Sequence, residues 1–172
     1  MAVYKETITG LISKGVSPTY FNITEEVKAI IERSGIKNGI ICVISPHTTC
    51  SVFFEEFCHD LMPNGKEFLQ QDLDNVLEKI IPDQTKWGQY FYPGTLHFEE
   101  VESWPDYLKY LPLGNREELF NCDAHLKATI LGNSATFELD EGKLGFGVTG
   151  YIYFVDFDRN RSRTRRCKVV II

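Results

Sequence analysis

Short apolar runs and amphipathic stretches follow one another along the chain without a regular order. Residues 3–9 alternate β-forming and polar side chains, which is typical of a half-buried strand. Residues 40–45 are continuously apolar but too short for a helix, so they predict a buried strand that ends at Pro46. Further strands are expected at residues 51–54, 136–139, 144–157 and 164–172, with a turn at 140–143 joining two of them into a hairpin.

Other stretches carry apolar residues at helical spacing. Residues 25–34 follow Asn22 and Thr24, which favour the N-terminus of a helix, and Gly35 is placed to end this helix in a left-handed conformation. Two more helices are expected, at residues 66–81, ended by Pro82, and at residues 123–131, capped by Asn121 and ended by Gly132. Strands and helices mixed without a βαβ repeat predict an α+β fold with a mixed, largely antiparallel sheet and a few packed helices.

Residues 83–120 differ in composition from the rest of the chain. They contain both tryptophans and three of the seven prolines. Long connections of this kind usually cover a site or an interface, and an aromatic-rich insertion can equally pack as a small satellite core. Both interpretations stay open. The sequence therefore predicts a single domain over residues 1–172 with an aromatic-rich insertion at about 83–120.

Composition and charge narrow the class of protein. Hydrophobic residues make up 43% and charged residues 24%, which is ordinary for a globular protein, and the net charge of -6 makes nucleic acid an unlikely partner. No apolar run approaches the length of a membrane span, and the N-terminus lacks the order of a signal peptide. We expect a soluble, cytoplasmic protein. The five cysteines contain no C-x-x-C pair, which favours a structural role for them.

Three histidines stand where rigid elements end or begin. His47 follows Pro46 after a predicted strand, His97 follows a turn-like segment, and His125 lies in the first turn of a predicted helix. Imidazole is a common metal ligand, but the chain has no H-x-x-x-H motif, so the three are either a metal site assembled by the fold or hydrogen-bonded structural residues. Glu55 is a candidate general base or ligand, or else a solvated strand end.

A second feature is basic. Arg159, Arg161, Arg163 and Arg165 alternate, so in an extended segment they would form a positive stripe on one face. Guanidinium groups suit phosphate or carboxylate. The stripe would hold a phosphorylated ligand or would pair with acidic residues of the chain or of a neighbouring subunit.

Several blocks of the sequence resemble one family. The segment SPHTTC at residues 45–50 resembles the PHTTA segment of the YjbQ family, and residues 55–60 fall where that family carries ENADPDV. The segment NCDAHLKATILGNS at 121–134 resembles NSDAHIKA…LGSS, and residues 154–163 resemble the closing EFDGPRxR. The blocks occur in the family's order over nearly the whole chain.

This resemblance implies a YjbQ-like α+β domain that assembles as a homotrimer, with a polar pocket built from the histidine segments. The family is often labelled secondary thiamine-phosphate synthase, after a weak activity that joins a pyrimidine diphosphate to a thiazole phosphate with loss of pyrophosphate. The resemblance implies a divalent metal (Zn, Mg or Mn) at His47, His97 and His125. The implied catalytic residues are His47, Glu55, Asn121 and His125, and the implied substrate-binding residues are Thr48, Thr49, Arg161 and Arg163.

Two functions from different classes follow. The first is a metal-assisted enzyme acting on phosphorylated small molecules, and the second is a non-catalytic trimeric protein that binds a metal or a phosphorylated metabolite. The chain departs from the family pattern at residues 57–59, at residues 147–150 and in the long insertion between His97 and Asn121. Because these positions are expected to border the pocket, the family label does not fix the substrate.

Overall fold

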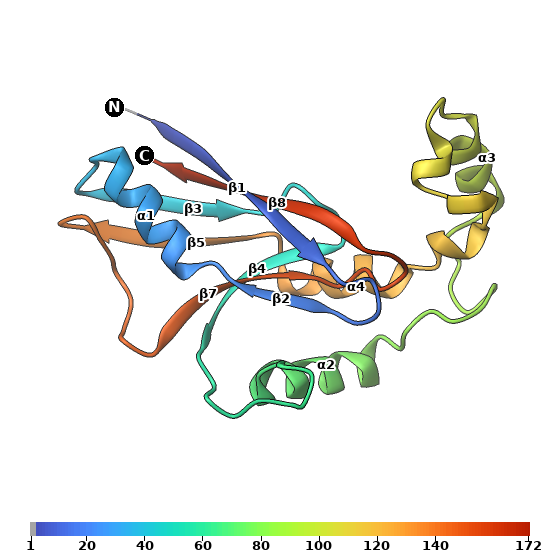
Figure 1. Cartoon of the computed structure of the whole chain (residues 1–172), viewed down its shortest axis with the longest axis horizontal. Helices are drawn as coiled ribbons and strands as arrows, with labels where there is room; N and C mark the ends of the chain where they lie inside the picture. Colours follow the sequence, from blue (N-terminus) through green and yellow to red (C-terminus); the bar gives the residue numbers. More distant parts are fainter. Residues whose placement is uncertain (1–2) are drawn as a thin grey trace.

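The computed structural model describes residues 3–172, which form two antiparallel sheets with helices packed against them (Figure 1). The larger sheet has the strand order β1 (Tyr4–Ser13), β8 (Arg163–Ile171), β3 (Gly39–Ile44), β5 (Ser134–Asp140) and β6 (Lys143–Leu144). The smaller sheet has the order β2 (Thr19–Asn22), β7 (Gly150–Asp156) and β4 (Cys50–Glu56). Sheets and helices together confirm the predicted α+β class.

The α-helices of the described residues are α1 (Thr24–Ser34), α2 (Phe68–Ile80), α3 (Thr95–Ser103) and α4 (Cys122–Leu131). Gly35 ends α1 with φ 66°, the left-handed conformation that the sequence predicted. Between α3 and α4 the chain makes three short 3₁₀ turns, at Tyr107–Lys109, Pro112–Gly114 and Arg116–Leu119. No helix of residues 3–172 combines the length and the apolar character that crossing a bilayer requires.

The strands differ from the prediction in two details. All strand pairings within residues 3–172 are antiparallel, in agreement with the largely antiparallel sheet that was predicted, but they form two sheets. The predicted long strand at 144–157 is interrupted, because β6 ends at Leu144 and β7 starts at Gly150 in the other sheet. β2 was missed because it has only four residues and none of them is fully buried.

The main hydrophobic core lies between α1 and the two sheets. It includes Val27 and Ile30 of α1, Ile41 of β3 and Ile152 of β7, each at most 1% exposed. A second cluster joins α2 and α4 to the smaller sheet through Leu77, Ala124 and Val155, and a third lies within the insertion around Phe98 and Leu111. The insertion therefore does pack as a satellite core.

The inward face of strand β8 changes from charged to apolar along its length, and its charged end lies at the candidate site. Its odd-numbered residues face inward, and Cys167, Val169 and Ile171 are completely buried in the main core. Arg163 and Arg165 continue the same face toward the start of the strand. One face of β8 is thus apolar at one end and guanidinium-bearing at the other.

Candidate functional site

A cavity of about 310 Å³ opens where four segments meet. These segments are the β3–β4 connection, the start of α4, the start of β8 with the loop before it, and the insertion. Most of the side chains predicted as functional line this cavity: His47, Thr48, Thr49, His97, Asn121, His125, Arg161 and Arg163. A larger, shallower cavity of about 590 Å³ shares His47, Thr48 and His125 as a common wall.

The β3–β4 connection holds His47 through local hydrogen bonds. The backbone N–H of His47 donates to Oγ of Ser45 at 3.2 Å, and the N–H of Ser45 donates to the carbonyl of Asn133 at 2.7 Å. The N–H of Cys50 in turn donates to the carbonyl of His47 at 3.3 Å. Because Ser45 is completely buried, these bonds fix the turn that presents His47 and Thr48 to the cavity.

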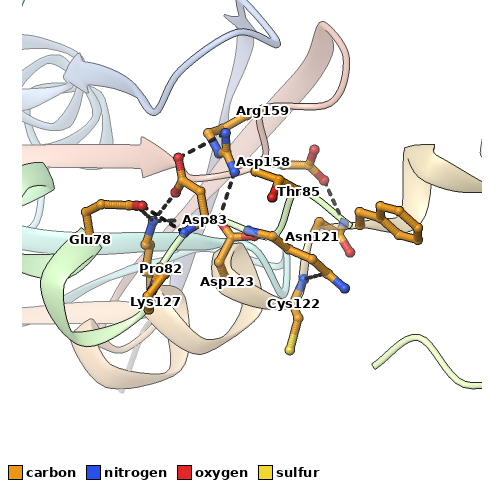
Figure 2. Close-up of polar contacts among 12 residues, drawn as sticks. Glu78, Pro82, Asp83, Thr85, Asn121, Cys122, Asp123, Lys127, Asp158 and Arg159 are labelled. Carbon is orange, nitrogen blue, oxygen red and sulfur yellow. Dashed lines mark hydrogen bonds and ion pairs between the residues drawn. The ribbon is translucent and has the colours of Figure 1, made fainter. Parts of the chain in front are cut away.

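Asn121 occupies the N-cap position of α4, but its side chain does not cap the helix. Instead Nδ2 of Asn121 donates to Oδ2 of the buried Asp158 at 2.9 Å (Figure 2). The predicted side-chain cap is therefore wrong, because a carboxylate far away in the sequence takes the amide. This bond holds Asn121 in the cavity wall.

Two arginines of the cavity wall, Arg163 and Arg165, pair with buried acids, and Arg161 lies 3.8 Å from Glu118. Arg165 donates from Nε and Nη2 to Asp156 at 2.7 and 3.0 Å, which ties β8 to β7 across the two sheets. Arg163 Nη2 lies 2.6 Å from Oδ2 of Asp158. Asp156 and Asp158 are completely buried and do not line the cavity. The cavity wall is therefore basic, because Asp156 and Asp158 lie behind the arginines and not on the cavity surface.

The predicted stripe of four arginines is only partly formed. Arg161, Arg163 and Arg165 line the cavity, whereas Arg159 turns away and pairs with Asp83 at 3.0 Å and with Asp123 at 3.6 Å. Arg159 and Arg161 both lie in the loop before β8, so the period of two residues holds only for Arg163 and Arg165. Arg165 is a cavity residue that the sequence argument left out of the substrate-binding set, although the alternation of arginines already pointed to it.

The three histidines make separate contacts in the cavity wall. Nε2 of His47 accepts a hydrogen bond from the backbone N–H of Arg166 at 3.2 Å, and Nε2 of His97 lies 3.1 Å from the hydroxyl of Tyr92. His125 packs edge-on against the ring of Tyr92, with ring centroids 5.3 Å apart. Burial lowers the pKa of both His47 and His125, and nearby arginine charges add to this effect, so both imidazoles are neutral at neutral pH.

This arrangement does not fit a preformed three-ligand metal centre. Within residues 3–172, no three His, Cys, Asp or Glu side chains come close enough together to hold one metal ion. Two of the histidine nitrogens already have protein partners. The expectation of zinc, magnesium or manganese at His47, His97 and His125 therefore stays a prediction without a formed ligand set.

Glu55 does not join the other candidate residues. It lies five residues beyond Cys50 along the extended strand β4, which at ~3.3 Å per residue is roughly 17 Å from the β3–β4 connection. There it faces Glu67, and burial followed by the negative charge of Glu67 raises the pKa of Glu55 to about 7. Its placement outside the cavity is at odds with the predicted catalytic role beside His47.

A network of buried charges fastens α4 beneath the cavity (Figure 2). The buried Lys127 donates to Asp83 at 2.6 Å and lies 3.4 Å from Glu78 and 3.6 Å from Asp123. Arg159 reaches the same two aspartates. The network joins α2, the start of the insertion, α4 and the β7–β8 connection. It fixes the helix that carries Asn121 and His125.

Gln84 links this network to the cavity wall. Its backbone N–H donates to Asp123 at 3.1 Å, and its side chain accepts from the N–H of Cys122 at 2.9 Å and donates to the carbonyl of Tyr92 at 2.9 Å. Gln84 thus caps α4 in place of Asn121. The sequence argument missed it because nothing local marks a glutamine as the cap of a helix 38 residues further on.

The insertion supplies the aromatic side of the cavity. Tyr92, Trp104 and Tyr110 line it, and the last two rings meet edge-on with centroids 4.9 Å apart. The sequence indicated this segment by its aromatic content without identifying these residues. The insertion therefore satisfies both predicted interpretations, since it has its own core and also covers the candidate site.

Comparisons with known proteins agree on one family. Residues 11–172 match the family model described as UPF0047 protein YjbQ-like. A UPF0047 protein of Methanothermobacter thermautotrophicus is 27% identical over 98% of this chain and 93% of its own length, and one of Archaeoglobus fulgidus is 30% identical over 83% of each. The UPF0047 protein YugU of Bacillus subtilis is 26% identical over 87% of each chain.

Solved structures agree with the sequence relatives. A crystal structure from Sulfolobus solfataricus, described as a YbjQ-like protein of unknown function, matches with a TM-score of 0.67 and 27% identity over 99% of this chain and 96% of that one. An uncharacterised YjbQ/UPF0047 protein from Clostridium acetobutylicum matches with a TM-score of 0.64 and 25% identity over 98% and 99%.

Proposed function

The chain belongs to the UPF0047 family of YjbQ-like proteins, and on that premise we propose that its basic cavity binds a phosphorylated small molecule. The observation that carries the proposal is the wall formed by Arg161, Arg163 and Arg165. Asp158 and Asp156, which pair with Arg163 and Arg165, are buried behind it, and Arg161 lies 3.8 Å from Glu118. Guanidinium groups held in this way bind phosphate oxygens without first having to be ordered.

The reaction proposed for this cavity is the one that the family label names. The bond between the pyrimidine methylene carbon and its diphosphate oxygen breaks, and the thiazole nitrogen forms a bond to that carbon. Thiamine phosphate and pyrophosphate are the products, and the pyrophosphate leaves with the electron pair. Such a step requires stabilisation of the departing anion more than a strong base. The arginine wall supplies that stabilisation, while the neutral His47 and His125 orient the ligand.

The second candidate is a trimeric protein that binds the phosphorylated ligand without converting it. Its support is that two of the three cavity histidines are already engaged. His47 and His97 already have hydrogen-bond partners on their ring nitrogens, and Glu55, whose pKa near 7 suits a base, lies outside the cavity. The two candidates share the binding site and differ in turnover.

Binding is tested by titrating tag-free protein with pyrophosphate in a calorimeter. Removing one charge-assisted contact costs about 1.5–3 kcal/mol, so Arg163→Gln is expected to weaken binding about 10- to 100-fold. Lys168→Gln is the matched control, because Lys168 is exposed on the opposite face of the same strand. Failure of pyrophosphate to bind, or equal weakening by both variants, would contradict the proposed site.

Turnover is tested by ³¹P NMR with the pyrimidine diphosphate and the thiazole phosphate together. Formation of pyrophosphate that stops in His125→Ala, with pyrophosphate binding retained, supports the synthase. Binding of both substrates without product supports the second candidate. The size of the assembly is measured on the same samples by light scattering.

A further inference from the structure

Two residues in the wall of the basic cavity carry polar atoms without a hydrogen-bond partner among the described residues. These atoms are Oδ1 of Asn121, an acceptor, and Nε and Nη2 of Arg163, which are donors. Both residues line the cavity, and Asn121 is only 6% exposed. A buried polar atom without a partner costs about 1–3 kcal/mol, so such atoms in a cavity wall point to a ligand that satisfies them.

The orientation of the Asn121 amide is fixed by chemistry. Its Nδ2 faces Oδ2 of Asp158 at 2.9 Å (Figure 2), and an ionised carboxylate accepts hydrogen bonds but cannot donate them. Exchanging the amide oxygen and nitrogen would set two acceptors against each other. The atom left unpartnered is therefore the carbonyl oxygen, and it requires a donor.

Asp158 also holds the second orphaned group. Nη2 of Arg163 lies 2.6 Å from the same Oδ2 atom, although it is not aligned for a hydrogen bond. The carboxylate is itself fixed, because Oδ1 accepts from the N–H of Asn160 at 3.2 Å and its own N–H donates to Asp156 at 3.1 Å. The unpartnered acceptor and donor are thus neighbours, both anchored on one buried carboxylate oxygen.

We propose that the ligand of this cavity is a phosphate monoester that carries a hydroxyl group close to its phosphate. A phosphate oxygen accepts from Arg163, and the hydroxyl donates to Oδ1 of Asn121. A protonated aliphatic amine would also donate, but its positive charge would lie beside three arginines, whereas a hydroxyl donates without this repulsion. The inference rests on the proposed function only in taking the anion to be a phosphate. Neither the pyrimidine diphosphate nor the thiazole phosphate carries a hydroxyl beside its phosphate, so the inference favours the second candidate, which binds a phosphorylated ligand without converting it.

Two matched probes test the inference at pH 8, ethyl phosphate and 2-hydroxyethyl phosphate. The second pKa of a phosphate monoester is about 6, so at this pH neither phosphate brings a proton of its own to Asn121. One hydrogen bond contributes about 0.5–1.5 kcal/mol, so the hydroxyethyl ester is expected to bind about 2- to 12-fold more tightly to the wild-type protein. Affinities are measured by ³¹P NMR titration.

Variants test whether the preference for the hydroxyethyl ester comes from Oδ1 of Asn121. In Asn121→Leu the ratio of the two affinities is expected to fall to about one, and in Arg163→Gln both affinities fall while the ratio is kept. Asn75→Leu, an exposed asparagine on α2 outside the cavity, is the control and keeps both values. If Asn121→Leu does not fold, as judged by circular dichroism, the smaller change Asn121→Ala replaces it.

The outcomes separate this inference from the proposed function. Equal affinity of the two esters for the wild-type protein, or a preference that survives in the Asn121 variant, overturns the hydroxyl assignment and leaves the phosphate site standing. Absence of binding by either ester overturns the phosphate site itself.

Discussion

Replacing Glu55 by Gln is expected to stabilise the protein at pH 8 and to leave its stability nearly unchanged at pH 4.5. Oε2 of Glu55 is buried without a partner, and burial and then the charge of Glu67 raise the pKa of Glu55 from 4.5 to about 7. The folded state therefore holds the proton more tightly than the unfolded chain does. The stability that this provides is complete below pH 4.5 and is lost as the pH rises through 7.

The size of the effect follows from that shift. A pKa shift of one unit corresponds to about 1.36 kcal/mol, so the shift of Glu55 would contribute about 3 kcal/mol to the free energy of unfolding if the side chain were fully buried. Because Glu55 is only half buried, solvent screening reduces this contribution to about 1–2 kcal/mol. Glutamine carries no charge at any pH and avoids the loss. For a chain of this length the gain at pH 8 amounts to roughly 3–6 °C in Tm.

The assay is urea unfolding of the wild-type protein, Glu55→Gln and the control Glu56→Gln at both pH values. Glu56 is the next residue of β4 and its side chain is exposed, so its replacement is expected to change the free energy of unfolding by less than about 0.5 kcal/mol. The reasoning is refuted if Glu55→Gln destabilises the protein at pH 8, or if its effect is the same at pH 4.5 and pH 8.

Two more predictions concern stability. Lys127→Met is expected to lower the free energy of unfolding by about 3 kcal/mol, because it removes a buried charge that partners the buried Asp123 and the partly buried Asp83. Lys28→Met breaks an exposed pair and is expected to cost less than about 1 kcal/mol. Equal losses for the two variants in urea unfolding would contradict the stabilising role of Lys127. Gly15→Ala is expected to cost more than about 2 kcal/mol, since its φ is 72° and a Cβ would lie 2.1 Å from the backbone of Arg161. Gly10→Ala is the control: Gly10 has a φ of 77° but open space around it, so the variant is expected to cost only about 1 kcal/mol. Equal losses of Tm in the two variants would contradict the close approach of Gly15 to Arg161.

The sequence predicts those parts of the fold that are determined by local patterns. The helix ending at Gly35 and the apolar strand before Pro46 follow from spacing and from the conformational preferences of single residues. The interruption between β6 and β7 could not be read in the same way, because Phe146 and Val148 continue a strand-like pattern through a segment that leaves the sheet. Which sheet a strand joins depends on contacts distant in the sequence.

In the candidate site, too, the sequence predicts what local residue types indicate and misses what depends on contacts distant in the sequence. The histidine and arginine segments were found because their residue types are informative, and the fold brings them to one cavity. Asn121 was expected to cap a helix, and only the buried Asp158 explains why it does not. Glu55 was assigned from the family resemblance and from its place beyond a predicted strand, but the extended strand β4 carries it away from the β3–β4 connection.

The satellite core of the insertion has a consequence for how such proteins diverge. Phe98, Val101, Leu111 and Leu119 pack among themselves at one end of the molecule (Figure 1), apart from the core that holds β8. Asn160 fastens the end of this unit by donating to the carbonyls of Glu118 and Phe120. The aromatic wall can therefore be rebuilt by mutation while the arginine wall is inherited unchanged. If the cavity binds a phosphorylated ligand as proposed, its ligand selectivity and its anion binding would be inherited separately.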